Sequence, residues 1–149
     1  MFVQHSVHID SPLEAVTAVL VAGPGEWFPN RDDSGESDVS PQVGGISVRN
    51  KVAVDVGPPV TTGDWTEIPV TWKATFIENL FPVMTGKVEL SPVDARTTKL
   101  TVCGMYEPPF GPLGKPVDDA FIHAVAEATV VDLAHSIARR IAAVLARAH

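Results

Sequence analysis

The chain has 149 residues, of which 45% are hydrophobic, and a formal net charge of −7. This length matches one ordinary domain with a substantial core, so we expect a single domain over residues 1–149. The acidic balance and the scattered basic residues argue against a nucleic-acid-binding surface, and the single cysteine excludes an intrachain disulfide framework.

The N-terminal stretch MFVQHSVHID alternates polar with apolar residues and lacks the basic region and apolar run of a signal peptide. The longest apolar runs fall short of the ~20 residues that a membrane span needs. No Cys/His spacing resembles a structural zinc site. We therefore expect a soluble, cytoplasmic protein with no integral membrane segment, no metal and no cofactor. The oligomeric state stays open.

The first third of the chain predicts a strand, a helix and a loop. Residues 2–9 alternate with the period of a strand. A helix is predicted to begin at Ser11-Pro12, with Ser11 and Glu14 as a capping box, and to end near Val21. We expect a short helical turn at 26–29. A surface loop over 30–45 should follow, with at most one short strand at 38–40.

Four longer segments then alternate with one polar and one apolar face, at 46–56, 66–77, 82–90 and 98–106. Gly57-Pro58-Pro59 and Gly63-Asp64 indicate turns between them. Clean alternation in consecutive strands predicts an antiparallel sheet with one wet and one covered face.

The cover is predicted to be a helix over about 117–146, which at ~1.5 Å per residue spans some 45 Å. Its apolar arc carries Ile122, Ala126, Thr129, Val130, Leu133, Ile137 and Val144, and its polar arc carries Glu127, Asp132, His135 and Arg139. The predicted fold class is α+β. A curved antiparallel sheet wraps around a long C-terminal helix, with one or two short helices after the first strand.

Local sequence adds a family resemblance over nearly the whole chain. HIDSPLEAV resembles the first strand and helix start of the START/SRPBCC (helix-grip) superfamily, and EWFP stands where many members carry a tryptophan. The stretches VTWKATFIENLFPVM and GMYEPPFGPLG resemble an actinobacterial polyketide cyclase/dehydrase-like branch. The resemblance implies a mostly apolar cavity between the sheet and the last helix. It says little about activity, because this superfamily holds enzymes, carriers and receptors.

The loop from Tyr106 to Lys115 holds three prolines and two glycines, which stiffen and bend the backbone. Neither G-x-x-x-x-G-K-[ST] nor G-x-G-x-x-G is present, so a phosphate-binding loop is disfavoured. The resemblance implies a cavity rim here, and a rigid connector is an equal alternative.

Inward parity, the helix arc and the resemblance together predict the residues that contact a ligand. Each is a core residue first, and the small Ala126 and Thr129 favour a cavity because ordinary cores are closely packed. The predicted ligand-binding residues are Trp27, Phe28, Val52, Val54, Trp72, Phe76, Met84, Leu100, Tyr106, Phe110, Ile122, Ala126, Thr129 and Leu133. Trp27 and Phe28 would close the cavity mouth or cap an ordinary core.

Polar groups on the covered side need partners. Tyr106 and Asn50 have inward parity and Arg140 lies near the apolar arc, so these groups either satisfy one another or face a ligand's polar end. The histidines offer no metal pair by spacing, because His123 and His135 lie about 120° apart around the helix. No nucleophile elbow is present, and catalytic residues stay unknown.

Two functions from different classes follow. The leading hypothesis is that the protein binds or carries a small hydrophobic molecule, such as a lipid, polyketide or aromatic compound, in an internal cavity. The alternative is a cyclase, aromatase or dehydratase acting on a polyketide-like substrate, with Tyr106 and Arg140 as the first pair to test. A closed core with a protein partner is a third option.

Overall fold

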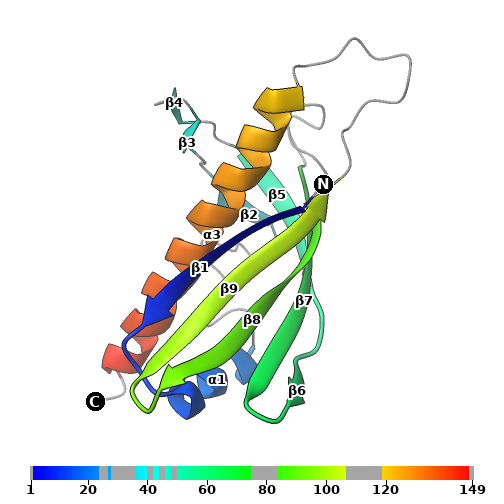
Figure 1. Cartoon of the computed structure of the whole chain (residues 1–149). Helices are drawn as coiled ribbons and strands as arrows, with labels where there is room; N and C mark the ends of the chain where they lie inside the picture. The colour runs from blue at the N-terminus through cyan, green and yellow to red at the C-terminus, as the bar shows by residue number, and fades with distance from the viewer. Residues whose placement is uncertain are drawn as a thin grey trace.

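A computed structural model of the chain describes residues 2–23, 27, 36–39, 42–43, 46–47, 50–74, 84–106 and 119–147 (Figure 1). Residues 36–39, 42–43, 46–47, 50–53, 73–74 and 119–122 are described by their backbone alone. In chain order the elements are β1 (Phe2–Ile9), α1 (Leu13–Val21), β2 (Glu36–Val39), β3 (Gln42–Val43), β4 (Ile46–Ser47), β5 (Asn50–Val56), β6 (Val60–Thr62), β7 (Trp65–Ala74), β8 (Met84–Asp94), β9 (Thr97–Tyr106) and α3 (Asp119–Arg147).

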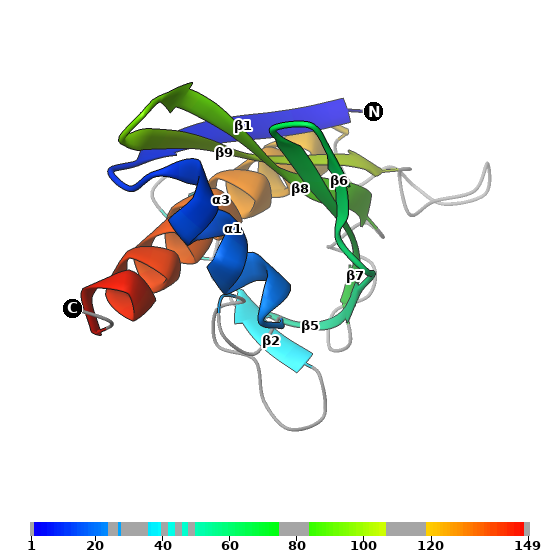
Figure 2. The ribbon, with the colours of Figure 1, turned by 90° about the horizontal axis from the view of Figure 1, so that it is seen from below.

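The main sheet has the strand order β1-β9-β8-β7-β5-β2, and β6 also pairs with β7. Each of these pairs is antiparallel. Seen from below, the sheet curves from β1 round to β2, and α3 and α1 lie within the curve (Figure 2). The predicted α+β class, with a curved sheet around a long C-terminal helix, is confirmed.

Alternation along the strands sorts side chains onto an inner and an outer face. The register places Leu90 opposite Leu100 and Val88 opposite Val102, and these four inner side chains are each at most 1% exposed. On the outer face, Lys87 forms ion pairs with Glu67 at 3.1 Å and with Glu89 at 2.9 Å. The antiparallel sheet therefore has the one covered and one polar face that its sequence predicts.

Helix α3 covers the inner face where β1 and β9 lie, and α1 packs against the same helix. Its buried side chains recur at helical spacing and comprise Val125, Ala126, Thr129, Val130, Leu133, Ala134, Ile137 and Ile141. This stripe includes the predicted arc from Ala126 to Ile137 and extends it by Val125, Ala134 and Ile141. The core lies between this stripe and the sheet.

The start of α1 differs from the prediction. The capping residue is Pro12, and no side chain caps the helix, so the Ser11–Glu14 capping box is not formed. Instead the carbonyl of Pro12 accepts from the N–H groups of Ala15 and Val16. The helix begins one residue later than a Ser11 cap requires, because Pro12 stays in an extended conformation at ψ 152°.

Thr98 on β9 joins the turn before α1 to the sheet. A substitution of Thr98 therefore tests how much this contact stabilises the fold. The Thr98 side chain is fully buried and its Oγ1 donates to the carbonyl oxygen of Ser11 at 2.8 Å. Thr98→Val keeps the shape but removes the donor, so we expect it to cost about 1–3 kcal/mol of unfolding free energy in a urea titration. The exposed Thr85→Val should stay within ~0.5 kcal/mol. Equal costs for both variants would contradict the assigned role.

Two predictions about strands need correction. The segment predicted as one strand over 46–56 is divided, because β4 pairs with β3 in a separate small sheet whereas β5 joins the main sheet. Strand β6 was not predicted, and it forms a hairpin with β7 through Gly63, whose φ of 61° favours glycine. The predicted turn at 26–29 lies outside the described residues except for Trp27. No helix in the described ranges is long and apolar enough to cross a bilayer.

Candidate functional site

Three large side chains form one row across the inner face of the sheet. Trp72 on β7 lies opposite Met84 on β8, which in turn lies opposite Tyr106 on β9. All three are at most 3% exposed. A molecule that reaches them must therefore come between the sheet and α3 rather than from the outer face.

A pair of glycines stands beside this row and gives it room. Gly86 and Gly104 are cross-strand partners in β8 and β9. A Cβ on Gly104 would lie 2.9 Å from the Met84 methyl carbon and 3.5 Å from the Trp72 ring. The Trp72 and Met84 side chains therefore pack directly against the backbone of Gly104. Glycine within a strand often marks such a close approach.

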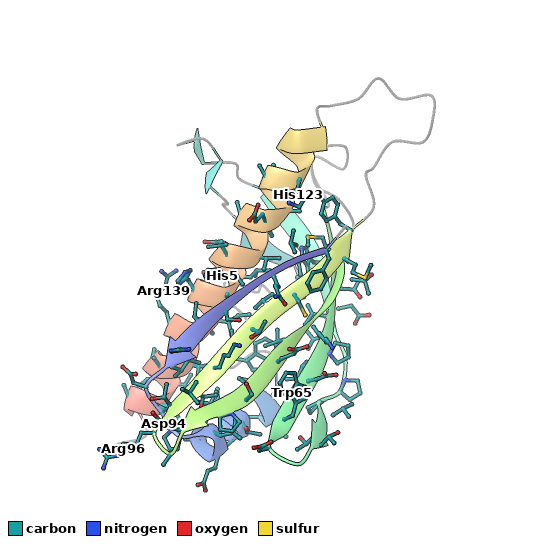
Figure 3. The ribbon with its side chains drawn as sticks, in the orientation of Figure 1. His5, Trp65, Asp94, Arg96, His123 and Arg139 are labelled. Carbon is teal, nitrogen blue, oxygen red and sulfur yellow. The ribbon has the colours of Figure 1, made fainter. Side chains whose placement is uncertain are left out.

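At the same end of the sheet, Tyr106 meets α3. Its hydroxyl oxygen is 2.6 Å from Nδ1 of His123, and Nε2 of His123 is 3.8 Å from a carboxylate oxygen of Glu127. When His123 carries its proton on Nε2, toward Glu127, its Nδ1 accepts from the Tyr106 hydroxyl. Figure 3 shows His123 on the upper part of α3, next to that end of the sheet.

Burial falls steadily along these three groups. Tyr106 is 2% exposed, the His123 side chain is 41% exposed and the Glu127 side chain is 61% exposed. The chain of polar groups thus leads from the apolar interior to water. Chemically, it can fix the polar end of an apolar molecule, and it can pass a proton between the interior and solvent.

The predicted ligand-binding residues whose side chains the structure describes are all buried in the core. They are Trp27, Val54, Trp72, Met84, Leu100, Tyr106, Ala126, Thr129 and Leu133. Val52 and Ile122 belong to β5 and α3, but their side chains lie outside the described part, as do Phe28, Phe76, Phe110 and all of residues 107–118. Burial is consistent with core and with ligand contact alike, so their contact with a ligand stays a prediction.

Local bonds define the roles of several of these groups. The Thr129 hydroxyl donates to the carbonyl of Val125 at 2.7 Å, so its polar group is satisfied within the helix. The Trp27 indole N–H donates to the carbonyl of Leu20 at 3.2 Å, and the side chain is fully buried against the end of α1. The Thr129 hydroxyl and the Trp27 N–H therefore already donate within the protein and are not needed to bind a ligand.

The pair Tyr106–Arg140 suggested by the sequence is not formed. Arg140 is exposed and lies 17 residues beyond His123 on the same helix, about 25 Å along its axis. The side chain of Asn50 lies outside the described part.

Cys103 belongs to the outer face, away from this row. Burial raises the pKa of its thiol, and Sγ donates to the carbonyl of Lys87 at 3.6 Å. The neutral thiol is thus the favoured form. A thiolate nucleophile is what cysteine catalysis needs, so the site is not built on Cys103.

Sequence reasoning missed His123 as a partner of Tyr106. The two residues are 17 apart in sequence, one on a strand and one on a helix, and the periodicity of each element carries no information about the other. The only available signal was that His123 lies one turn before Glu127, a spacing at which two helical side chains meet.

Neither a protein-family model nor a curated protein sequence matches the chain. Solved structures do match it. The Zhui aromatase/cyclase from Streptomyces sp. R1128 has 18% identity and a TM-score of 0.53, with 95% of this chain and 93% of that chain covered. The chain has the helix-grip fold.

Two further structures share it. Norcoclaurine synthase from Thalictrum flavum has 11% identity and a TM-score of 0.55, covering 98% of this chain and 86% of that one. Ara h 8.0201 has 12% identity and a TM-score of 0.54, covering 96% of this chain and 98% of that one. Identities this low establish the shared fold alone, and the helix-grip architecture expected from the sequence is confirmed at that level.

Proposed function

We propose that this helix-grip protein binds or carries a small hydrophobic molecule between the inner face of the sheet and α3. The observation that carries the proposal is the hydroxyl of Tyr106, which is buried among apolar side chains yet bonded to the partly exposed His123. Ligand sites typically combine mostly apolar walls with a few placed polar groups, and this arrangement supplies both.

The chemistry of the walls narrows the ligand class. Trp72 and Met84 offer an aromatic ring and a polarizable thioether next to the Tyr106 ring, a combination suited to flat or aromatic molecules. The polar groups of the site, Tyr106 and His123, would bind one hydroxyl, carbonyl or carboxylate of the ligand. A lipid, a polyketide or another aromatic compound with one polar end meets both requirements.

The test is native mass spectrometry of the purified full chain, followed by solvent extraction and a titration with 1-anilinonaphthalene-8-sulfonate. We expect a co-purified apolar compound, or failing that, saturable binding of one dye per chain. A bound molecule near Trp72 should also shift tryptophan emission. A chain that carries no compound and binds the dye without saturation would overturn the proposal.

A specific observation also favours a second candidate, a polyketide cyclase, aromatase or dehydratase acting at the same place. The order Glu127, His123, Tyr106 is that of an orienting carboxylate, an imidazole and a group that exchanges a proton with a substrate. One structural neighbour is itself an aromatase/cyclase. The extracted compound separates the two functions, because a carrier returns its ligand unchanged whereas an enzyme converts it. Tyr106→Phe should retain binding and abolish any conversion.

A further inference from the structure

Two histidines from opposite ends of the sequence meet beside the edge of the main sheet. His5, which Figure 3 labels, has inner-face parity on β1, where it pairs in register with Val102. His135 belongs to α3. Their Nε2 atoms are 3.3 Å apart and their ring centroids are 5.1 Å apart. The two Nε2 atoms thus lie next to each other between strand and helix.

The separation of these two nitrogens also matches that of two ligands on one metal ion. Without a metal, one ring donates its Nε2–H to Nε2 of the other at 3.3 Å, near the long end of the usual range of about 2.7–3.2 Å. Two imidazole nitrogens at about 2.0–2.1 Å from a tetrahedral ion are separated by about 3.3 Å. The rings therefore already have the spacing of two ligands on one ion.

The surroundings leave room for the remaining ligands. Both histidines line an open groove of about 920 Å³ between β1 and the C-terminal half of α3. Ser6, His8, Asp10 and Arg139 also line it. The Arg139 guanidinium donates to the Ser136 hydroxyl at 3.2 Å. Within the described ranges no group of three His, Cys, Asp or Glu side chains could hold a metal. Water would complete the coordination.

We propose that His5 and His135 form a two-histidine site for a divalent transition-metal ion of the imidazole-preferring kind, Cu²⁺, Ni²⁺ or Zn²⁺. With only two protein ligands the ion exchanges readily and a chelator removes it. The ligands stand 130 residues apart, so the chelating pair exists only in the folded chain. Binding ties the edge strand β1 to α3 and stabilises the fold by mass action. The separate sequence patterns did not predict this site.

The test is isothermal titration of the chelator-treated full chain with Ni²⁺ and with Zn²⁺, together with thermal melts. We expect one ion per chain and a higher Tm with metal. His5→Gln and His135→Gln should each weaken binding by more than about tenfold, since even changes outside the coordinating ligands cost 10–100-fold. His8→Gln is the matched control, because His8 is an exposed imidazole that lines the same groove but has the opposite parity to His5 on β1. It should bind as the parent does.

Three results would overturn the site: no binding by the parent, undiminished binding by His135→Gln, or equal losses in all three variants. Electron paramagnetic resonance of the Cu²⁺-loaded parent gives a readout that needs no variant to fold. The site requires hyperfine structure from two imidazole nitrogens, and a single-nitrogen spectrum would also count against it.

Discussion

Gly86→Ala should destabilise the protein by about 3 kcal/mol or more, at the upper end of the usual cost of overpacking. A Cβ at this position would stand 1.9 Å from the carbonyl oxygen of Cys103 and 2.8 Å from the Cα of Gly104. Both are backbone atoms of the neighbouring strand β9, so no rotamer change can relieve the contact. Strands β8 and β9 would have to separate.

The matched control is Gly104→Ala, on the cross-strand partner of Gly86. Its Cβ would meet the Met84 methyl at 2.9 Å, which is the end of a flexible side chain that can turn away. We expect a cost of about 1 kcal/mol, measured with Gly86→Ala by chemical denaturation. If Gly86→Ala were as stable as the parent, the close approach of β8 and β9 would be wrong.

Ala126→Phe should abolish binding of an apolar molecule to the interior. Ala126 is fully buried on α3, within one turn of His123, so a phenyl ring there would occupy space between the helix and the sheet. We expect the parent to bind one 1-anilinonaphthalene-8-sulfonate and the variant to bind none, while its urea unfolding stays cooperative. Ala143→Phe, on an exposed position of the same helix, should bind dye as the parent does.

The same variant also separates a binding site from a closed core. In a closed core the added ring has nowhere to go and should cost about 1–3 kcal/mol of stability. A destabilised Ala126→Phe, made from a parent that never bound dye, would therefore decide against the proposed function.

Local patterns were enough to predict the sheet and its cover. Alternation placed Trp72, Met84 and Tyr106 on one face because the side-chain period of a strand is two, and the structure has them there. The same rule failed at 46–56, where alternation is broken only at Asn50 while the pairing partner changes from β3 to β7. Periodicity reports which face a residue occupies, but it does not report which strand lies beside it.

The polar contacts could not be predicted in this way. Tyr106 meets His123, and His5 meets His135, only once the sheet register and the path of α3 are set. His135 was assigned to the polar arc and is indeed exposed, yet a strand from the other end of the chain lies beside it. Residues 5 and 135 carry no local signal of each other, because their contact depends on tertiary packing.

The most direct measurement of the central claim uses the fact that Tyr106 is the only tyrosine of the chain. Ring-¹³C labelling of tyrosine and tryptophan gives NMR signals for Tyr106 without assignment by mutation. It also gives a signal for Trp65, which is exposed and bonded to Glu67 on the outer face.

The labelled chain is titrated with its extracted compound, or with 1-anilinonaphthalene-8-sulfonate where no compound is extracted. We predict that the Tyr106 signals shift and saturate at one ligand per chain while those of Trp65 stay in place. Saturable binding that leaves Tyr106 unchanged would contradict a ligand site between the sheet and α3.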